Sequence, residues 1–208
     1  MINEKYLWVT RAERLHHNGT FFADTYTIHE TRNTASALNE RNNLQNNPGT
    51  TSFHSVVDDK EVVRCVPFTT GCYHAGTYTG NHTSLSLEIC SGALENQFDK
   101  TWKNVVDVIA KDLASLGWGV DKLRQHNHWS GKDCPYKIRH ENLWGRLKED
   151  VEKRMRDMQN EKKQKTDFAD ARKWVIDKGI SDGSNPKDTV TREQVWAMLY
   201  RMEKERGK

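Results

Sequence analysis

The chain has 208 residues, enough for one medium domain and one small one. Its 32 Lys and Arg against 29 Asp and Glu leave a net charge of +3, too weak by itself to indicate nucleic-acid binding. The first nineteen residues, MINEKYLWVTRAERLHHNG, contain no apolar run typical of a signal peptide, and no stretch is long enough to cross a bilayer. We therefore expect a soluble protein without membrane insertion that stays in the cytosol until something releases it.

The four cysteines are few and irregularly spaced: Cys65, Cys72, Cys90 and Cys134. In a reducing compartment this pattern does not predict a disulfide framework. Whether Cys65 and Cys72 pair is left open by the sequence.

Several runs in the first half of the chain have the alternation of β-strands. β-branched and aromatic residues alternate over 24–31, which predicts a strand entering the core. Two further β-rich runs within 51–68 surround Asp58, Asp59 and Lys60, which is typical of a hairpin. The stretch SLSLEIC (84–90) alternates serine with leucine and predicts another strand.

Helical spacing appears in three places before residue 159. A helix is predicted over 33–44, with Asn33 and Thr34 as its cap. The clearest helix covers 98–116, where apolar residues recur at three- and four-residue steps and Gly117 ends the pattern. A similar apolar pattern over 141–158 predicts a further helix.

The last fifty residues differ in composition from the rest of the chain. The polar run 159–166 predicts a linker or a frayed helix end. Residues 167–208 predict two helices, the first ending at Gly179 and the second capped by Thr191, with Gln194 at capping-box spacing. So short a segment has a thin core, and we expect it to dock on something or to self-associate.

A candidate metal site combines the end of the first strand with the stretch QHNHWSGKDCP. His29 ends the strand, and His126 and Cys134 flank a loop that contains Gly131. Two imidazoles and a thiolate form a tetrahedral zinc set with one corner open, as in catalytic sites. The spacing is not specific, and by strand alternation His126 and His128 would share a face, so that either could be the ligand.

Amide hydrolysis at such a site also needs a base and a positive group for the oxyanion. In SLSLEIC, Glu88 points away from the more apolar face, so it is a candidate base. Lys132 lies two residues before Cys134 and is a candidate for the positive group. The residues alone favour an ordinary solvated carboxylate for Glu88, and they allow a loop lysine in water for Lys132.

Five separated stretches carry a resemblance to a known family: TYTIHET, TSFHSVVDDKEVVRCVP, CYHAG, SLSLEIC and RQHNHWSGKDCPYKI. In order and spacing the chain resembles the zinc-dependent N-acetylmuramoyl-L-alanine amidases of the type 2 family. That family includes peptidoglycan recognition proteins and bacteriophage endolysin domains. The resemblance implies an α/β fold for residues 1–158, with a central mixed β-sheet flanked by helices.

The resemblance also assigns roles to the candidate residues. It implies Zn²⁺ held by His29, His126 and Cys134, with Glu88 and Lys132 as the catalytic groups. The implied reaction is hydrolysis, by zinc-activated water, of the amide between N-acetylmuramic acid and L-alanine of the stem peptide. The implied partner is bacterial peptidoglycan. The implied role is lysis of the host wall at phage release, after residence in the host cytoplasm.

Three further positions match residues that line the substrate groove in the family. His54 and His74 correspond to groove histidines, and His74 is expected to meet the muramyl-peptide stem. Phe53 stands where some members carry a tyrosine that polarises the scissile carbonyl, so more of that work is expected from Lys132 and zinc. His128 stands where many members have aspartate, and the effect of that change is left open.

The C-terminal stretch WVIDKGISDGSNPKDTVTREQVWAMLYRM is similar to a single surface-layer-homology repeat. The resemblance implies that residues 167–208 form a helical cell-wall-binding or oligomerisation module, through which the chain forms a homo-oligomer. A plain helical hairpin packed on the amidase is the alternative.

Two other functions fit the sequence less well. A non-catalytic peptidoglycan-binding module is disfavoured because such proteins usually lack the ligand cysteine, which is present here. The contiguous tripeptide HNH at 126–128 is not the nuclease motif of that name, whose residues spread over a ββα unit. Together with the weak net charge, this disfavours a nucleic-acid partner.

Overall fold

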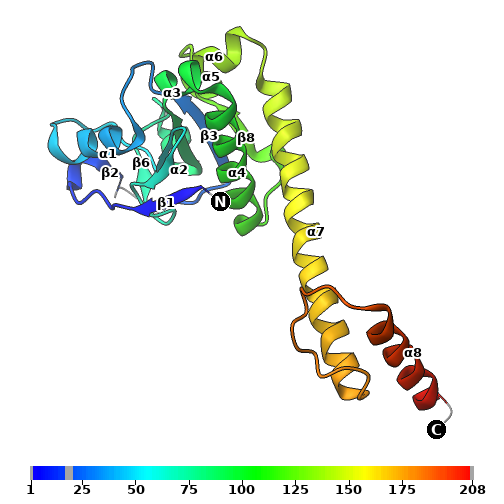
Figure 1. Cartoon of the computed structure of the whole chain (residues 1–208). Helices are drawn as coiled ribbons and strands as arrows, with labels where there is room; N and C mark the ends of the chain where they lie inside the picture. Colours follow the sequence, from blue (N-terminus) through cyan, green and yellow to red (C-terminus); the bar gives the residue numbers. More distant parts are fainter. Residues whose placement is uncertain (1, 17–20, 207–208) are drawn as a thin grey trace. The chain divides into compact units, whose positions relative to one another are not determined.

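The computed structural model describes residues 2–16 and 21–206 and divides the chain into two compact units, Met1–Met155 and Arg156–Lys208. The first unit contains all the strands that the structure describes (Figure 1). These are β1 Asn3–Tyr6, β2 Leu15–His16, β3 Thr25–Glu30, β4 Ser55–Val57, β5 Glu61–Arg64, β6 Gly71–Cys72, β7 Ser84–Ile89 and β8 Leu123–Gln125. The helices are α1 Ala37–Asn46, α2 Tyr78–Thr83, α3 Ser91–Asn96, α4 Phe98–Leu116, α5 His126–Ser130, α6 Tyr136–His140, α7 Trp144–Asp177 and α8 Arg192–Arg206.

Six of the strands form one mixed sheet in the order β1-β5-β4-β7-β3-β8. All neighbours pair in parallel except β4 and β5, which are antiparallel and form the predicted hairpin. The strands predicted from 24–31 and 84–90 are the central neighbours β3 and β7. The expected α/β architecture with a mixed sheet flanked by helices is confirmed.

The sheet register decides which residues share a face. His29 pairs with Glu88, and Glu88 pairs with Val56 on its other side. Because directly paired residues point to the same face, these three lie on one side of the sheet. Ile28 and Leu87 pair on the opposite side, where both are fully buried. The alternation of SLSLEIC thus places Glu88 beside His29.

Helix α4 covers the face of the sheet opposite His29. Its predicted apolar stripe is buried, and it contacts β4 and β5. Gly117 ends the helix with φ of 70°, a left-handed conformation that glycine adopts without strain. Asp112, on this helix, lies against the sheet. Its carboxylate accepts hydrogen bonds from the Tyr26 hydroxyl at 2.7 Å and from the Arg64 guanidinium at 2.7 and 2.8 Å.

The predicted cap of the first helix is wrong. Helix α1 begins at Ala37, and Ser36 caps it by accepting a hydrogen bond from the Asn39 amide at 3.3 Å. Asn33 instead organises the preceding turn, because its side chain accepts from the Ala35 amide at 2.8 Å and donates to Glu40 at 2.6 Å. Asn33 and Ser36 are both good capping residues, and the local turn decides between them.

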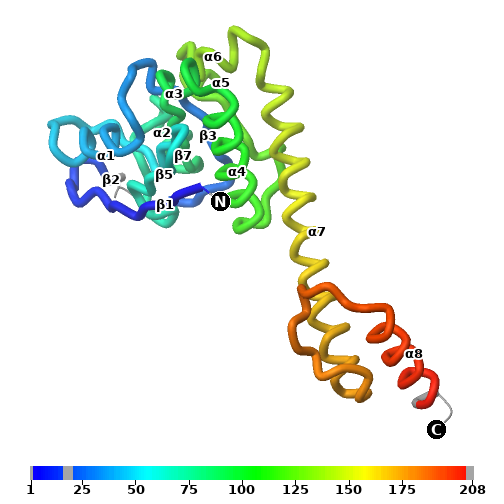
Figure 2. The backbone as a smooth tube through the Cα atoms, viewed as in Figure 1, coloured from blue at the N-terminus to red at the C-terminus, as the bar shows by residue number. Residues whose placement is uncertain are grey.

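Residues 159–166 lie inside a helix. The backbone of α7 continues through them without a break, as Figure 2 shows. The run QNEKKQKT is rich in Gln, Glu and Lys, all strong helix formers, so helix propensity dominates over the lack of apolar burial. The predicted capping box of α8 is confirmed: the Thr191 amide donates to Gln194 Oε1 at 2.8 Å, and the Gln194 amide donates to Thr191 Oγ1 at 3.2 Å.

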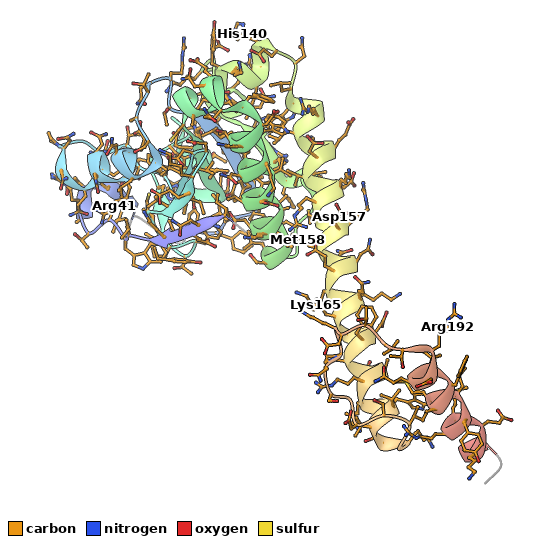
Figure 3. The ribbon with its side chains drawn as sticks, in the orientation of Figure 1. Arg41, His140, Asp157, Met158, Lys165 and Arg192 are labelled. Carbon is orange, nitrogen blue, oxygen red and sulfur yellow. The ribbon has the colours of Figure 1, made fainter. Side chains whose placement is uncertain are left out.

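The second unit buries little apolar surface. Among its described residues Ile180 is the one buried large hydrophobic side chain. Figure 3 shows the side chains along α7 and α8, with Lys165 and Arg192 labelled. Large hydrophobic side chains are exposed on this unit: Phe168, Trp174, Ile176, Val190, Val195, Trp196, Leu199 and Tyr200.

Two sequence expectations concern the whole described chain. The cysteines at positions 65, 72, 90 and 134 are all free, so Cys65 and Cys72 do not pair. A membrane-spanning helix is absent from residues 2–16 and 21–206, since none there combines the required length and hydropathy.

The Asp112 carboxylate is expected to be a major source of stability. Asp112→Ala leaves the buried Arg64 guanidinium with only Glu4 and Ser55 as partners, and should lower the free energy of unfolding by about 3 kcal/mol. Chemical denaturation measures this. Glu95→Ala, at an exposed carboxylate, is the control and should change it by less than about 0.5 kcal/mol. Equal effects of the two variants would contradict the role of Asp112.

Candidate metal centre

Three predicted ligands converge from different elements. His29 lies near the end of β3, His126 begins α5, and Cys134 lies in the loop before α6. The two Nδ1 atoms are 3.0 Å apart, and Cys134 Sγ is 3.9 Å from His29 Nδ1. One ligand atom from each residue lies within 4.8 Å of the others, and all three residues are buried. This is the donor set that the sequence predicted, now in a single cluster.

The structure decides between His126 and His128, which the spacing alone left open. The stretch expected to alternate as a strand is helix α5, His126–Ser130. Residues two apart on a helix point in different directions, and His128 is exposed with its ring against Trp129. The expectation of a shared face is therefore wrong, and His126 alone is directed at His29 and Cys134.

The loop that carries Lys132 and Cys134 is tied back to α5. Gly131 adopts φ of 75°, a left-handed conformation that ends the short helix. The Asn127 carboxamide donates to the backbone carbonyls of Gly131 at 2.9 Å and Lys132 at 3.1 Å. The Asn127 amide donates to the Cys134 carbonyl at 2.9 Å. Asn127, which no sequence signal indicated, thus holds the loop at Gly131, at Lys132 and at Cys134 itself.

Glu30 supports Cys134 from the strand side. Its carboxylate accepts hydrogen bonds from the amides of Lys137 and Ile138, each at 3.0 Å, at the start of α6. Its backbone amide donates to Cys134 Sγ at 3.4 Å. Glu30 follows His29 directly, so one strand end orients one ligand and anchors the segment that carries another. No sequence signal separated this carboxylate from an ordinary one at a strand end.

Hydrogen bonds determine the tautomer of His29. His74 Nε2 lies 3.0 Å from the Ser84 carbonyl, which can only accept, so this nitrogen carries the proton. Burial lowers the pKa of His74 to about 4, so its ring is neutral at pH 7 and Nδ1 is an acceptor. His29 Nε2, at 3.1 Å, must therefore donate to it. His29 Nδ1 is left with a free lone pair.

His126 contacts the same segment of the chain as His29. Its ring hydrogen-bonds the Ala75 backbone, and its Nε2 lies 3.9 Å from where a Cβ on Gly76 would stand. Burial lowers the pKa of His126 to about 4, and that of His29 well below its usual value. The Nδ1 atoms of the two neutral rings face each other at 3.0 Å. A neutral imidazole nitrogen without a proton is a metal ligand, so a cation could be held by both rings.

The Cys134 thiol must lose its proton before it can bind a metal. Burial, and secondarily Glu88, raises the pKa of Cys134 to about 12, so the free thiol stays protonated at neutral pH. A metal cation deprotonates a coordinating thiol. Two imidazole nitrogens and a sulfur are also the ligand types that Zn²⁺ prefers. The residues present therefore fit a zinc ion.

Glu88 and Lys132 both lie close to the cluster. Glu88 Oε1 is 3.9 Å from His29 Nδ1, and Glu88 Oε2 is buried with no hydrogen-bond partner among the described residues. Burial raises the pKa of Glu88 to about 8. Lys132 is exposed, and its charge lowers the pKa of His29, His126 and Glu88. The Glu88 carboxyl thus lies beside the donors, and the Lys132 charge is near enough to act on them.

The predicted groove residues lie in different surroundings. His54 is fully buried, with Nε2 at 3.0 Å from the Thr70 carbonyl and Nδ1 at 3.0 Å from the Ser86 amide. Its ring centroid is 6.2 Å from that of His74. Phe53 packs in a hydrophobic cluster with residues such as Leu44. That position gives no support to a substrate-groove role for Phe53, because its side chain is buried among apolar neighbours.

Comparisons with known proteins identify the family of the chain. A family model described as N-acetylmuramoyl-L-alanine amidase matches residues 19–137, more than half of the chain. The N-acetylmuramoyl-L-alanine amidase CwlA of Bacillus subtilis (strain 168) is 39% identical over 136 residues, which cover 62% of this chain and 49% of CwlA. The chain thus spans about half the length of the curated relatives that it matches.

Solved structures share the fold of the first unit. The structure of PlyL has a TM-score of 0.65 at 30% identity, covering 73% of this chain and 97% of PlyL. The solution structure of the PlyG catalytic domain has a TM-score of 0.66 at 29% identity, covering 72% of this chain and 93% of that domain. By its sequence match and its fold, the chain belongs to the N-acetylmuramoyl-L-alanine amidase family.

Proposed function

We propose that the first unit is a zinc-dependent peptidoglycan amidase. It cleaves the amide bond between N-acetylmuramic acid and L-alanine of the stem peptide. The observation that carries the proposal is the convergence of His29 Nδ1, His126 Nδ1 and the Cys134 thiol, with the two nitrogens 3.0 Å apart. Family membership and the amidase relatives supply the substrate class.

In this proposal the zinc ion is held by His29, His126 and Cys134. When bound, it would lower the pKa of water and polarise the scissile carbonyl. Glu88 is the general base that takes a proton from the attacking water, because its Oε2 has no described partner and its Oε1 lies 3.9 Å from His29 Nδ1. The same carboxyl then gives the proton to the leaving amine of L-alanine.

Lys132 supplies the positive charge for the oxyanion. Its place in the loop fixed by Asn127 keeps it near Cys134, and it is exposed, so its ammonium can approach a bound substrate. An electrostatic donor held near the developing charge lowers the barrier without reorganisation. With phenylalanine at 53 buried in the core, no hydroxyl is available from that position.

The amidase relatives support a biological setting for this activity. We propose that the substrate is the cell wall of a bacterial host, and that the protein acts as a phage endolysin released from the host cytoplasm to lyse that wall. Mass spectrometry of peptidoglycan digested by the pure protein tests this. New L-alanine amino termini and intact glycan strands are expected, and cleavage of another bond would contradict it.

A non-catalytic wall-binding module is the alternative. It would keep the fold without the metal chemistry. The clustering of His29, His126, Cys134 and Glu88 is the observation that favours the enzyme over this module.

Loss of a ligand should remove both zinc and activity. Cys134→Ser and His126→Ala are expected to lose bound zinc and to abolish lysis of purified cell walls, as a chelator should do with the unaltered protein. Metal content by mass spectrometry and turbidity of wall suspensions measure the two effects. The exposed His128→Ala is the control and should keep its zinc. Full lysis by metal-free protein would contradict zinc dependence.

A substitution at Glu88 should separate zinc binding from catalysis. Glu88→Gln is expected to keep zinc but to lower turnover by about 10²- to 10⁴-fold, because the amide side chain cannot take a proton. Zinc content and the rate of L-alanine release from a soluble muramyl peptide measure the two. A rate equal to that of the unaltered protein would exclude Glu88 from the mechanism.

We propose that the C-terminal segment 167–208 is a cell-wall-binding or oligomerisation module. What supports this is the exposure of its large apolar side chains, since so little of their surface is buried within the unit. Trp196 and Tyr200, four residues apart on α8, share one helix face and are 62% and 63% exposed.

Polar substitution of that face should weaken association. The double variant Trp196→Ser, Tyr200→Ser is expected to reduce binding to sedimented cell walls or self-association by about tenfold or more. Hydrolysis of a soluble muramyl peptide should stay unchanged. Analytical ultracentrifugation distinguishes the two kinds of association, and the exposed Lys187→Ala is the control. Unchanged wall binding and unchanged oligomeric state together would contradict the module.

A further inference from the structure

One short segment touches both imidazoles of the cluster. His74 and Ala75 follow β6 in the stretch CYHAG. The His74 side chain accepts from His29 Nε2, and the Ala75 backbone hydrogen-bonds the His126 ring. The two histidines come from β3 and α5, which are far apart in the sequence. One dipeptide nevertheless hydrogen-bonds the rings of both.

The dipeptide is itself fixed by one side chain. Asn81 Oδ1 accepts hydrogen bonds from the backbone amides of His74 at 3.0 Å and Ala75 at 2.8 Å. Asn81 lies in α2, and its own amide donates to the Thr77 carbonyl at 3.1 Å. A single acceptor thus holds both amides, so the position of the dipeptide depends on the Asn81 carbonyl oxygen.

The surroundings of His74 leave it no free group for a substrate. His74 is only 5% exposed. One of its ring nitrogens donates to the Ser84 carbonyl, and the other accepts from His29. Binding a muramyl peptide through this ring would require breaking one of these bonds. The chain from Ser84 through His74 to His29 instead directs the His29 lone pair toward His126 and Cys134.

We propose that the dipeptide His74–Ala75, held by Asn81, sets the tautomer and orientation of both metal-binding histidines. His74 is thus a positioning residue and not a substrate contact. The inference rests on the proposed zinc site and adds to it the residues that prepare it. Groups that hydrogen-bond the far nitrogen of a ligand histidine typically change metal affinity by about 10- to 100-fold.

Metal affinity tests this directly. Zn²⁺ affinity is measured by competition with a chromophoric chelator, and Co²⁺ absorption reports the thiolate and the ligand geometry. His74→Phe keeps a ring but removes both nitrogens, and is expected to weaken Zn²⁺ binding by about 10- to 100-fold and to alter the Co²⁺ spectrum. His54→Phe is the matched control, another buried histidine bonded to a carbonyl and an amide, and should keep the affinity.

Asn81 provides an independent pair of variants. Asn81→Leu removes the acceptor for both amides and should weaken Zn²⁺ binding in the same direction. Asn81→Asp retains an oxygen at that position and should restore binding close to that of the unaltered protein. Thermal unfolding of the metal-free proteins shows which variants are folded, and the Asn81 pair decides the question if His74→Phe is not.

The outcomes separate this inference from the zinc site itself. If the unaltered protein binds neither Zn²⁺ nor Co²⁺, the proposed function fails and the inference fails with it. If it binds both metals, and folded His74→Phe and Asn81→Leu bind them equally well, only the inference is overturned. Loss of wall hydrolysis by His74→Phe at unchanged metal affinity would identify His74 as a substrate contact instead.

Discussion

The parallel pairing of β3 with β7 is the constraint on which the rest of the first unit depends. It places His29 directly beside Glu88, so a candidate ligand and a candidate base share one face without any loop having to position them. The opposite face of the same two strands is apolar and packs under α4. A shift of one residue in this register would exchange the two faces and bury the carboxylate under the helix.

Around that pair, hydrogen bonds hold the remaining groups. Asn127 and Glu30 bind the segments before and after Cys134, His74 bonds His29, and the Ala75 backbone hydrogen-bonds the His126 ring. The cluster is therefore preorganised, with its three ligand atoms within 4.8 Å of one another.

Much of the architecture could be predicted from local patterns. The alternation in 24–31 and 84–90 predicted β3 and β7, and the helical spacing after Phe98 predicted α4 with its end at Gly117. Local sequence patterns did not predict the structure where two conformations had similar free energies. Asn33 and Ser36 compete to cap α1, and the polar run 159–166 has helix propensity without an apolar face.

The sequence by itself determined the chemistry that the chain carries: which residues can bind zinc, which strand holds Glu88, and which family the motifs resemble. Only the tertiary structure decided which of His126 and His128 faces the cluster, that Phe53 belongs to the core, and that His74 bonds His29. The physical reason is distance along the chain. Periodicity reports the face of a residue within its own element, whereas a hydrogen bond between β3 and the CYHAG segment exists only once the sheet has brought them together.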